Sequence, residues 1–366
     1  MILSEDMYVP VLRWRLGEYQ ALLRLKPGIK DRIMPLICIP EVEFDFELRQ
    51  PKKTIHEHLS PFLMRYHKKW GPRPAWISLN ESIAVGRMDD GRHVFDFVFD
   101  GIRPYHAHAV PALSLSSDSD TLAAASRAIA RDDQGVGLLV RLEDLMTSGT
   151  LRKIVSLSKT LSVALEETDL IIDLGAPNFL PYKSFATALL AALRRVGNLT
   201  VYRNFVVVST AIPKNFKDVA GGTDAIPRHD WLFYQTLQTE MPSGMRRPVY
   251  GDYTIVHPDF AALDMRKIKS AGKVVYTTPE TWATRKGKAF RDDQKQMHTH
   301  CDAIVNETAF QFRGATFSSG DSYIARCAVH QATPSNLSRW KEVAINHHIT
   351  AVVDDLAKSA VASLRP

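Results

Sequence analysis

Charged side chains follow many of the short apolar runs of this sequence. Several are of the types that bind anions or transfer protons. Arginine binds a phosphate or carboxylate through two hydrogen bonds at once, and a carboxylate beside it can serve as acid or base. We expect four carboxylates to be catalytic: Glu18, Glu41, Asp173 and Asp252. We expect an anion to be bound by Arg13, Arg15, Arg141 and Tyr253. The alternative is a ring of salt bridges that only completes the fold.

Arg13 and Arg15 illustrate how these residues would be positioned. They end the first apolar run, and alternate residues of a strand share one face, so we expect both to point the same way. Asp173 closes the sixth expected strand and Asp252 adjoins the eighth, and these are the residues that would hold Mg²⁺. The sequence leaves the cofactor open.

Two motifs near the C-terminus add candidates. The run Ser318-Ser319-Gly320-Asp321-Ser322 combines a glycine that permits a tight turn with hydroxyls and amides that can hold a phosphate, so Ser319 and Asp321 are candidate ligands. His347 and His348 precede an amphipathic pattern over 349–356, which places them near a helix N-terminus that favours anions. We assign His347 as a general base and His348 as a phosphate ligand, with a surface or cap role as the alternative.

The formal net charge of +6 is concentrated in residues 49–73 and 266–300. Within the second segment Tyr276, Trp282 and Phe290 interleave with cations, a mixture in which rings stack on bases while cations meet phosphates. The cations expected to contact nucleic acid are Lys273, Arg285, Lys286, Lys288 and Arg291. The alternatives are solvated basic faces and a segment that packs its aromatic rings inward.

The sequence lacks the motifs that mark several classes of catalytic and binding site. The sequence has no Gly-x-Ser-x-Gly, no Cys-x-x-Cys, no Gly-x-x-x-x-Gly-Lys-Ser/Thr and no glycine-rich dinucleotide loop that follows a strand. His106 and His108 precede an apolar run instead of ending one, and the His298 to Cys301 group does not share one face of a helix. We therefore predict no transition-metal site.

The elements that must position these residues alternate between apolar β-type runs and helical patterns, which favours a parallel sheet. Eight strands are expected at 8–15, 33–42, 75–80, 109–114, 136–142, 170–174, 205–209 and 253–256. This matches a (β/α)8 barrel over residues 1–258, with residues 259–366 as a C-terminal portion packed on it; a doubly wound open sheet is the alternative. The run 94–102 alternates apolar and polar residues and predicts an added strand, paired with 83–86 in a hairpin.

The sequence contains no apolar stretch long enough to span a membrane. Glu5 and Asp6 stand where a secretory signal would have basic residues, and three cysteines cannot build a disulfide framework. We predict a cytoplasmic protein without a membrane partner.

The opening Tyr8-Val-Pro-Val-Leu-Arg-Trp-Arg-Leu-Gly-Glu18 resembles the Tyr-x-Pro-x-Leu-Lys-x-Lys-x-Gly-Glu signature of the bacterial and phage beta protein family. Further matches are Pro35 to Glu41, Arg141, Asp173, Arg228 with Trp231, Tyr250 to Tyr253, Phe317 to Asp321, Trp340, and Asn346 to Thr350. The resemblance spans residues 8 to about 356. It implies a barrel-like α/β fold and a place in prophages and in gene neighbourhoods associated with phage defence, but no reaction. Arg13 and Arg15 replace the family's lysines, which keeps the charge but excludes the role of a neutral amine.

Together these features predict a phage- or prophage-associated protein that recognises a phosphate-bearing ligand, either nucleic acid or a nucleotide, in a defence or counter-defence module. One alternative is a hydrolase that acts on a nucleotide or phosphodiester through carboxylates at the barrel mouth. Another is a protein-binding inhibitor or immunity-type partner, whose target would be a protein from the same gene neighbourhood. The sequence leaves the oligomeric state open.

Overall fold

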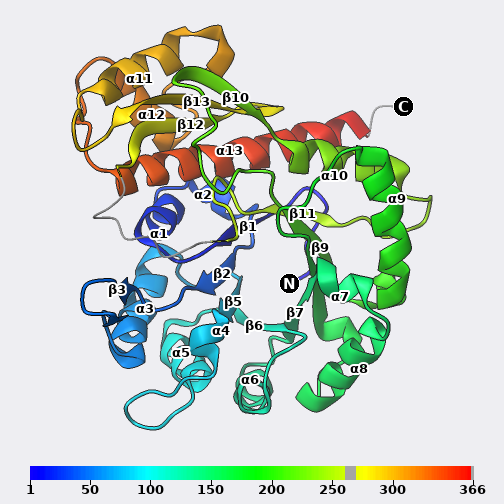
Figure 1. The fold of residues 1–366 in the computed structure, drawn as a ribbon. Helices are drawn as coiled ribbons and strands as arrows, with labels where there is room; N and C mark the ends of the chain where they lie inside the picture. The colour runs from blue at the N-terminus through cyan, green and yellow to red at the C-terminus, as the bar shows by residue number, and fades with distance from the viewer. Residues whose placement is uncertain (260–268, 364–366) are drawn as a thin grey trace. The chain divides into compact units, whose positions relative to one another are not determined.

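The computed structural model describes residues 1–259 and 269–363, which form two compact units (Figure 1). The first, here called the barrel unit, contains Met1–Trp14, Met34–Ser209 and Phe233–Asp252. The second unit contains Arg15–Ile33, Thr210–Leu232 and Tyr253–Pro366. Residues 15–33 and 210–232 thus belong to the second unit although they precede residue 258 in the sequence.

Eight parallel strands close into a barrel in the order β1-β11-β9-β8-β7-β6-β5-β2. Their bounds are β1 (Tyr8–Leu12), β2 (Leu36–Ile39), β5 (Ala75–Leu79), β6 (Ala109–Ser114), β7 (Val136–Arg141), β8 (Thr168–Asp173), β9 (Asn204–Ser209) and β11 (Val249–Asp252). Most of their residues are buried, because the strands of a parallel barrel are covered on both faces, and this gives the continuous apolar runs of the sequence. The predicted (β/α)8 fold is confirmed, and the open sheet is excluded.

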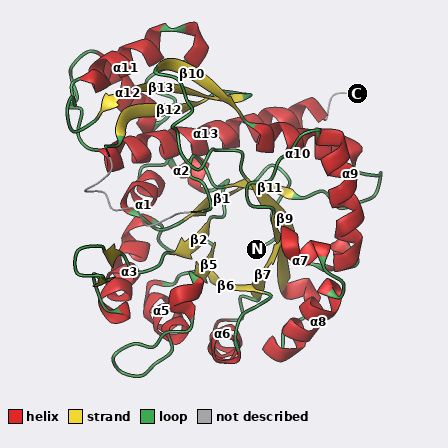
Figure 2. Cartoon of the chain, in the orientation of Figure 1, coloured by secondary structure: helices red, strands yellow, loops and turns green. Residues whose placement is uncertain are grey.

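Helices surround these strands in the barrel unit (Figure 2). They are α3 (Ile55–Lys69), α4 (Glu81–Ala84), α5 (Val94–Ile102), α6 (Ser119–Asp132), α7 (Leu142–Met146), α8 (Thr150–Leu161), α9 (Tyr182–Leu193) and α10 (His229–Glu240), which begins in the second unit. Short 3-10 helices are η1 (Arg103–Tyr105), η2 (Leu165–Glu167), η3 (Arg194–Val196) and η4 (Leu199–Val201), and a hairpin joins β3 (Phe44–Asp45) and β4 (Gln50–Pro51). The start of α3 is fixed by a capping box, in which Thr54 and Glu57 each bind the other's backbone N–H.

A buried carboxylate joins three strands at the N-terminal end of the barrel. Asp169 of β8 is fully buried and accepts a hydrogen bond of 2.8 Å from the Trp76 indole. Arg203 donates two more, at 2.7 Å from Nε and 2.6 Å from Nη2, and the Asn204 amide donates a fourth at 2.7 Å. Gly137 leaves room for the indole, since a Cβ there would lie 2.9 Å from Trp76 Cδ1. This network fills the barrel floor with satisfied polar groups.

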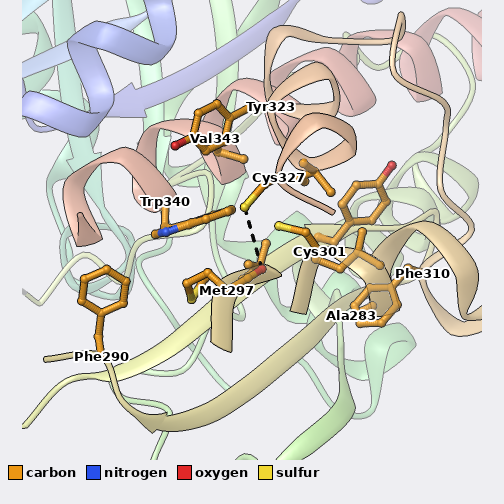
Figure 3. Close-up of a cluster of buried hydrophobic side chains, with 13 residues drawn as sticks. Ala283, Phe290, Met297, Cys301, Phe310, Tyr323, Cys327, Trp340 and Val343 are labelled. Carbon is orange, nitrogen blue, oxygen red and sulfur yellow. Dashed lines mark hydrogen bonds between the residues drawn. The ribbon is translucent and has the colours of Figure 1, made fainter. Parts of the chain in front are cut away.

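The second unit contains a three-stranded antiparallel sheet with helices. Its elements are α1 (Leu16–Leu23), α2 (Pro27–Lys30), β10 (Gly222–Pro227), β12 (Ala271–Thr277), β13 (Thr281–Ala289), α11 (Gln296–Asn306), η5 (Thr308–Phe310), α12 (Ser319–Ala328) and α13 (Leu337–Ser363), with β13 in the centre of the sheet. Figure 3 shows one hydrophobic cluster of this unit, in which Met297, Cys301, Cys327 and Trp340 pack with Val343. The cysteines are free thiols.

The predicted hairpin of 83–86 with 94–102 and the last predicted strand are wrong. Residues 94–102 form helix α5, in which Asp96 and Asp100 lie one turn apart and pair with Arg127 at 2.6 Å and Arg131 at 2.8 Å. The four-residue spacing of these aspartates gave the run its apparent alternation. The predicted partner strand 83–86 is also absent, because these residues form the end of α4 and the turn that follows it. The last barrel strand is β11, which ends at Asp252, so the strand predicted at 253–256 is misplaced.

Candidate functional site

Polar side chains gather at the C-terminal ends of the barrel strands, as the barrel geometry requires. Glu41 follows β2, and its Oε2 accepts a hydrogen bond of 3.4 Å from the Asn80 amide, which follows β5. Arg141 ends β7 and stands opposite Asp173, the last residue of β8, in the strand register. These residues lie at the mouth of the barrel unit, where Arg141 and Asp173 are neighbours in the strand register.

Arg141 is an exposed cation at this mouth. Its Nη2 lies 2.5 Å from Glu81 Oε1, yet the Arg141 side chain is 53% exposed and that of Glu81 is 69% exposed. Partial burial disfavours the charged form of Arg141 and would lower its pKa. The carboxylates of Glu81, Asp173 and Asp144 outweigh that effect, so the pKa of Arg141 is raised. The guanidinium therefore stays charged while its partner remains in contact with solvent.

Asp173 completes this arrangement at the end of β8. The side chain is half-buried, and its Oδ1 accepts a hydrogen bond of 2.9 Å from the Gly175 backbone. Gly175 has a φ of +64°, a conformation that glycine adopts without strain. The turn therefore fixes the carboxylate beside Arg141.

The residues that follow β1 depart from the prediction. The strand ends at Leu12, and Trp14 has a left-handed φ of 47°, so the alternation that put Arg13 and Arg15 on one face does not apply. Arg13 belongs to the barrel unit, whereas Arg15 and Glu18 belong to the second unit. Glu18 is buried and pairs with Lys341 at 3.0 Å, which gives this carboxylate a role in holding α1 to α13.

Asp252 is enclosed in the barrel wall. Its side chain is fully buried, and it accepts hydrogen bonds from the Tyr8 hydroxyl and, at 3.1 Å, from the Tyr250 hydroxyl. Tyr250 and Asp252 share a strand face, and the Tyr250 ring packs on Tyr234 of α10 with ring centroids 4.8 Å apart. This carboxylate therefore faces the helix layer, which contradicts a position at the open mouth. Tyr253 is half-buried and belongs to the second unit.

His347 and Asp321 form a buried pair within the second unit. His347 Nδ1 lies 2.8 Å from Asp321 Oδ2, and its Nε2 lies 2.9 Å from the Thr277 carbonyl oxygen. Each ring nitrogen thus lies within hydrogen-bonding distance of an oxygen of the same unit. Asp321 also accepts hydrogen bonds from the Tyr276 hydroxyl at 2.7 Å and the Ser318 hydroxyl at 2.5 Å. Burial alone would raise the pKa of Asp321, but the charge of His347 and these hydrogen bonds together lower it.

This network corrects the interpretation of both C-terminal motifs. Helix α13 begins at Leu337, so His347 and His348 lie in its middle and not near its N-terminus, and both are fully buried. His348 Nδ1 lies 2.8 Å from the Thr277 hydroxyl. Ser319 is the first residue of α12, and a Cβ on the following Gly320 would lie 2.4 Å from a backbone oxygen of α13. The motifs hold α12 and α13 together, and the predicted general base has no open surface.

The basic segment does not present one surface. Lys286 donates to three backbone oxygens, those of residues 216, 217 and 219 at 2.7, 3.3 and 2.7 Å, whereas Arg285 points to the other face of β13 and contacts Glu307 at 3.4 Å. Lys273 lies 4.1 Å from the centre of the Phe216 ring. Burial and the charges of Lys286 and Lys341 lower its pKa.

Two further cations of the predicted nucleic-acid set, Lys288 and Arg291, are open to solvent. Lys288 is exposed, and Arg291 lies beside Asp292 at 3.6 Å. The aromatic rings are not: Tyr276 and Trp282 are fully buried and Phe290 is nearly so. The expected stacking of bases on these rings is therefore wrong.

Among residues 1–259 and 269–363, no group of three or more His, Cys, Asp or Glu side chains could hold a metal ion. Across the same residues, no helix has the length and apolar character needed to cross a membrane.

Sequence reasoning missed Glu81 and Asp169. Glu81 directly follows the strand-ending Asn80, and that adjacency was a usable signal. Asp169 follows polar residues and directly precedes the apolar run 170–172, and nothing in the sequence distinguishes a buried carboxylate there from an exposed one at the start of a strand.

The model of a family described as Beta protein matches residues 8–354. The chain belongs to the Beta protein family. Among solved structures, triosephosphate isomerase from Bartonella henselae is similar with a TM-score of 0.35 and 13% identity, over 68% of this chain and 92% of that one. A comparison with curated proteins found no match.

Proposed function

We propose that the protein binds a phosphate-bearing ligand, a nucleotide or a nucleic acid, at the mouth of the barrel unit. The observation that carries the proposal is the Arg141–Glu81 pair. Both side chains are more than half exposed, and such surface pairs contribute only about 0–1 kcal/mol. A ligand phosphate can therefore replace Glu81 at small cost and gain a bidentate, charge-assisted contact.

Two further features support this assignment. The mouth lies at the C-terminal ends of the strands, where barrel proteins place their binding sites. The cations of the 273–291 segment are less suited to the role, because Lys286 and Arg285 are already engaged by the chain itself. We further propose a phage- or prophage-associated setting in a defence or counter-defence module, which rests on the resemblance of the opening residues 8–18 to that family's signature.

The test is binding at low salt by isothermal titration calorimetry with AMP and with a short oligothymidylate. Arg141→Gln is expected to weaken the affinity about 10- to 150-fold, since a hydrogen bond to a charged group contributes about 1.5–3 kcal/mol. The matched control is Arg92→Gln, because Arg92 is also half exposed and ion-paired, with Asp90 at 2.7 Å. Equal affinities of the wild type and Arg141→Gln would overturn the proposal.

A second candidate is hydrolysis of the bound ligand, favoured by the position of Asp173 beside Arg141 in the strand register. In that reaction Asp173 would act as base and Arg141 would stabilise charge on the phosphate. The assay is release of product from both probes with and without Mg²⁺. Loss of turnover in Asp173→Asn with retained binding would support catalysis, and unchanged turnover would exclude Asp173 from it.

A further inference from the structure

A cavity of about 360 Å³ lies within the second unit, beside α1 and the start of α13. Its lining includes Arg24, Tyr323, Asn336, Ser338, Arg339 and Glu342. The volume is at the lower end of the range for small-molecule sites. Most of the lining residues carry polar groups, and three of them are charged.

Two guanidinium groups converge on one carboxylate oxygen. Arg24 Nε lies 2.5 Å from Glu342 Oε1, and Arg339 Nη1 donates to the same oxygen. The Glu342 side chain is only 8% exposed. Each guanidinium carries five N–H donors, so one carboxylate can occupy only part of this set. The cavity therefore has one excess positive charge and a surplus of donors.

The surrounding residues hold the arginines in place. The Arg339 guanidinium lies 4.3 Å from the centre of the Tyr323 ring, and the Tyr323 hydroxyl donates to the Thr333 carbonyl at 2.7 Å. Arg339 is 17% exposed and Arg24 is 46% exposed, so one is fixed and the other can adjust to a ligand. Preorganisation of this kind lowers the entropy lost on binding.

The start of α13 adds to the positive potential. The Asn336 side chain accepts a hydrogen bond of 3.0 Å from the Arg339 backbone N–H, and it therefore caps this helix of 27 residues. The backbone dipoles of a helix place partial positive charge at its N-terminus. Ser338, in the first turn, offers a hydroxyl at the same end of the cavity.

We propose that this cavity binds a small molecule that carries a phosphate or carboxylate group, with Arg24 and Arg339 as its principal ligands. The excess positive charge favours anions over cations, and the volume suits a small molecule. This site is independent of the barrel mouth, because none of its residues takes part in the Arg141 arrangement.

The test is calorimetric titration of the full chain with inorganic phosphate and, in a separate arm, with acetate. Arg24→Gln and Arg339→Gln are each expected to weaken binding at least about tenfold, because each removes charge-assisted hydrogen bonds. The matched control is Arg326→Gln, since Arg326 also lies near the Tyr323 ring, at 5.9 Å, but does not line the cavity. The arm with the tighter affinity identifies the anion.

A further variant keeps the proposal testable if Arg339→Gln fails to fold. Glu342→Gln removes the competing carboxylate at constant size and is expected to strengthen anion binding. The proposal is overturned if neither anion binds to the wild type and Glu342→Gln, or if the arginine variants bind as the wild type does. It is also overturned if Arg141→Gln abolishes the signal, because the anion would then occupy the barrel mouth.

Discussion

Replacing Asp169 by asparagine should destabilise the barrel unit by about 3–5 kcal/mol, the cost of removing one partner from a buried ion pair. Asp169 is closed off from water: its side chain is 0% exposed, and that of its partner Arg203 is 14% exposed. The guanidinium of Arg203 would keep its charge without the carboxylate that neutralises it. The new amide would also turn N–H donors toward the donors of Trp76 and Asn204.

The measurement is urea unfolding of the intact chain at pH 7, followed by tryptophan fluorescence and by far-ultraviolet circular dichroism. Glu43→Gln is the control, because Glu43 forms an exposed pair with Lys52 at 3.2 Å, and its loss should cost less than about 1 kcal/mol. The reasoning is refuted if Asp169→Asn unfolds at the same urea concentration as Glu43→Gln.

Three other substitutions test contacts that lie within one unit or the other. Gly137→Ala should cost about 1–3 kcal/mol, because its methyl group would lie 2.9 Å from Trp76 Cδ1, and an unchanged midpoint of thermal unfolding would contradict this. The lowered pKa of Asp321 contributes stability that is present above the unfolded pKa of about 4 and is lost as the pH falls through the folded value. The free energy of unfolding should therefore fall less between pH 7 and pH 3 in Asp321→Asn than in the wild type, and equal falls would exclude this contribution. Lys286→Met should release residues 216–219 from its ammonium and speed their proteolysis, whereas an unchanged cleavage rate would show that these hydrogen bonds do not hold the loop.

The barrel could be predicted because its strands are buried on both faces and therefore appear as separate apolar runs. The run 94–102 misled because aspartates four residues apart fit both a helix surface and an imperfect alternation. The last strand was misplaced because Val249 to Asp252 includes a glycine and a buried carboxylate, whereas the residues that follow are more apolar.

The candidate site was predictable only where strand ends determined it. Arg141 and Asp173 end neighbouring strands, so their approach follows from the barrel topology. Asp252 and His347 have the same residue types as catalytic groups, and only the structure reveals that they are buried. Arg24 and Arg339 are separated by most of the sequence and come together only through tertiary packing, so no local pattern could predict their contact with the same carboxylate.

The most direct test of ligand binding at the barrel mouth compares Glu81→Gln with Arg141→Gln in titrations with AMP at low salt. If a ligand phosphate takes the place of Glu81 on Arg141, the first substitution removes the competitor and should lower the Kd, whereas the second should raise it. Opposite shifts are the predicted result. Equal Kd values for both variants and the wild type would contradict the account.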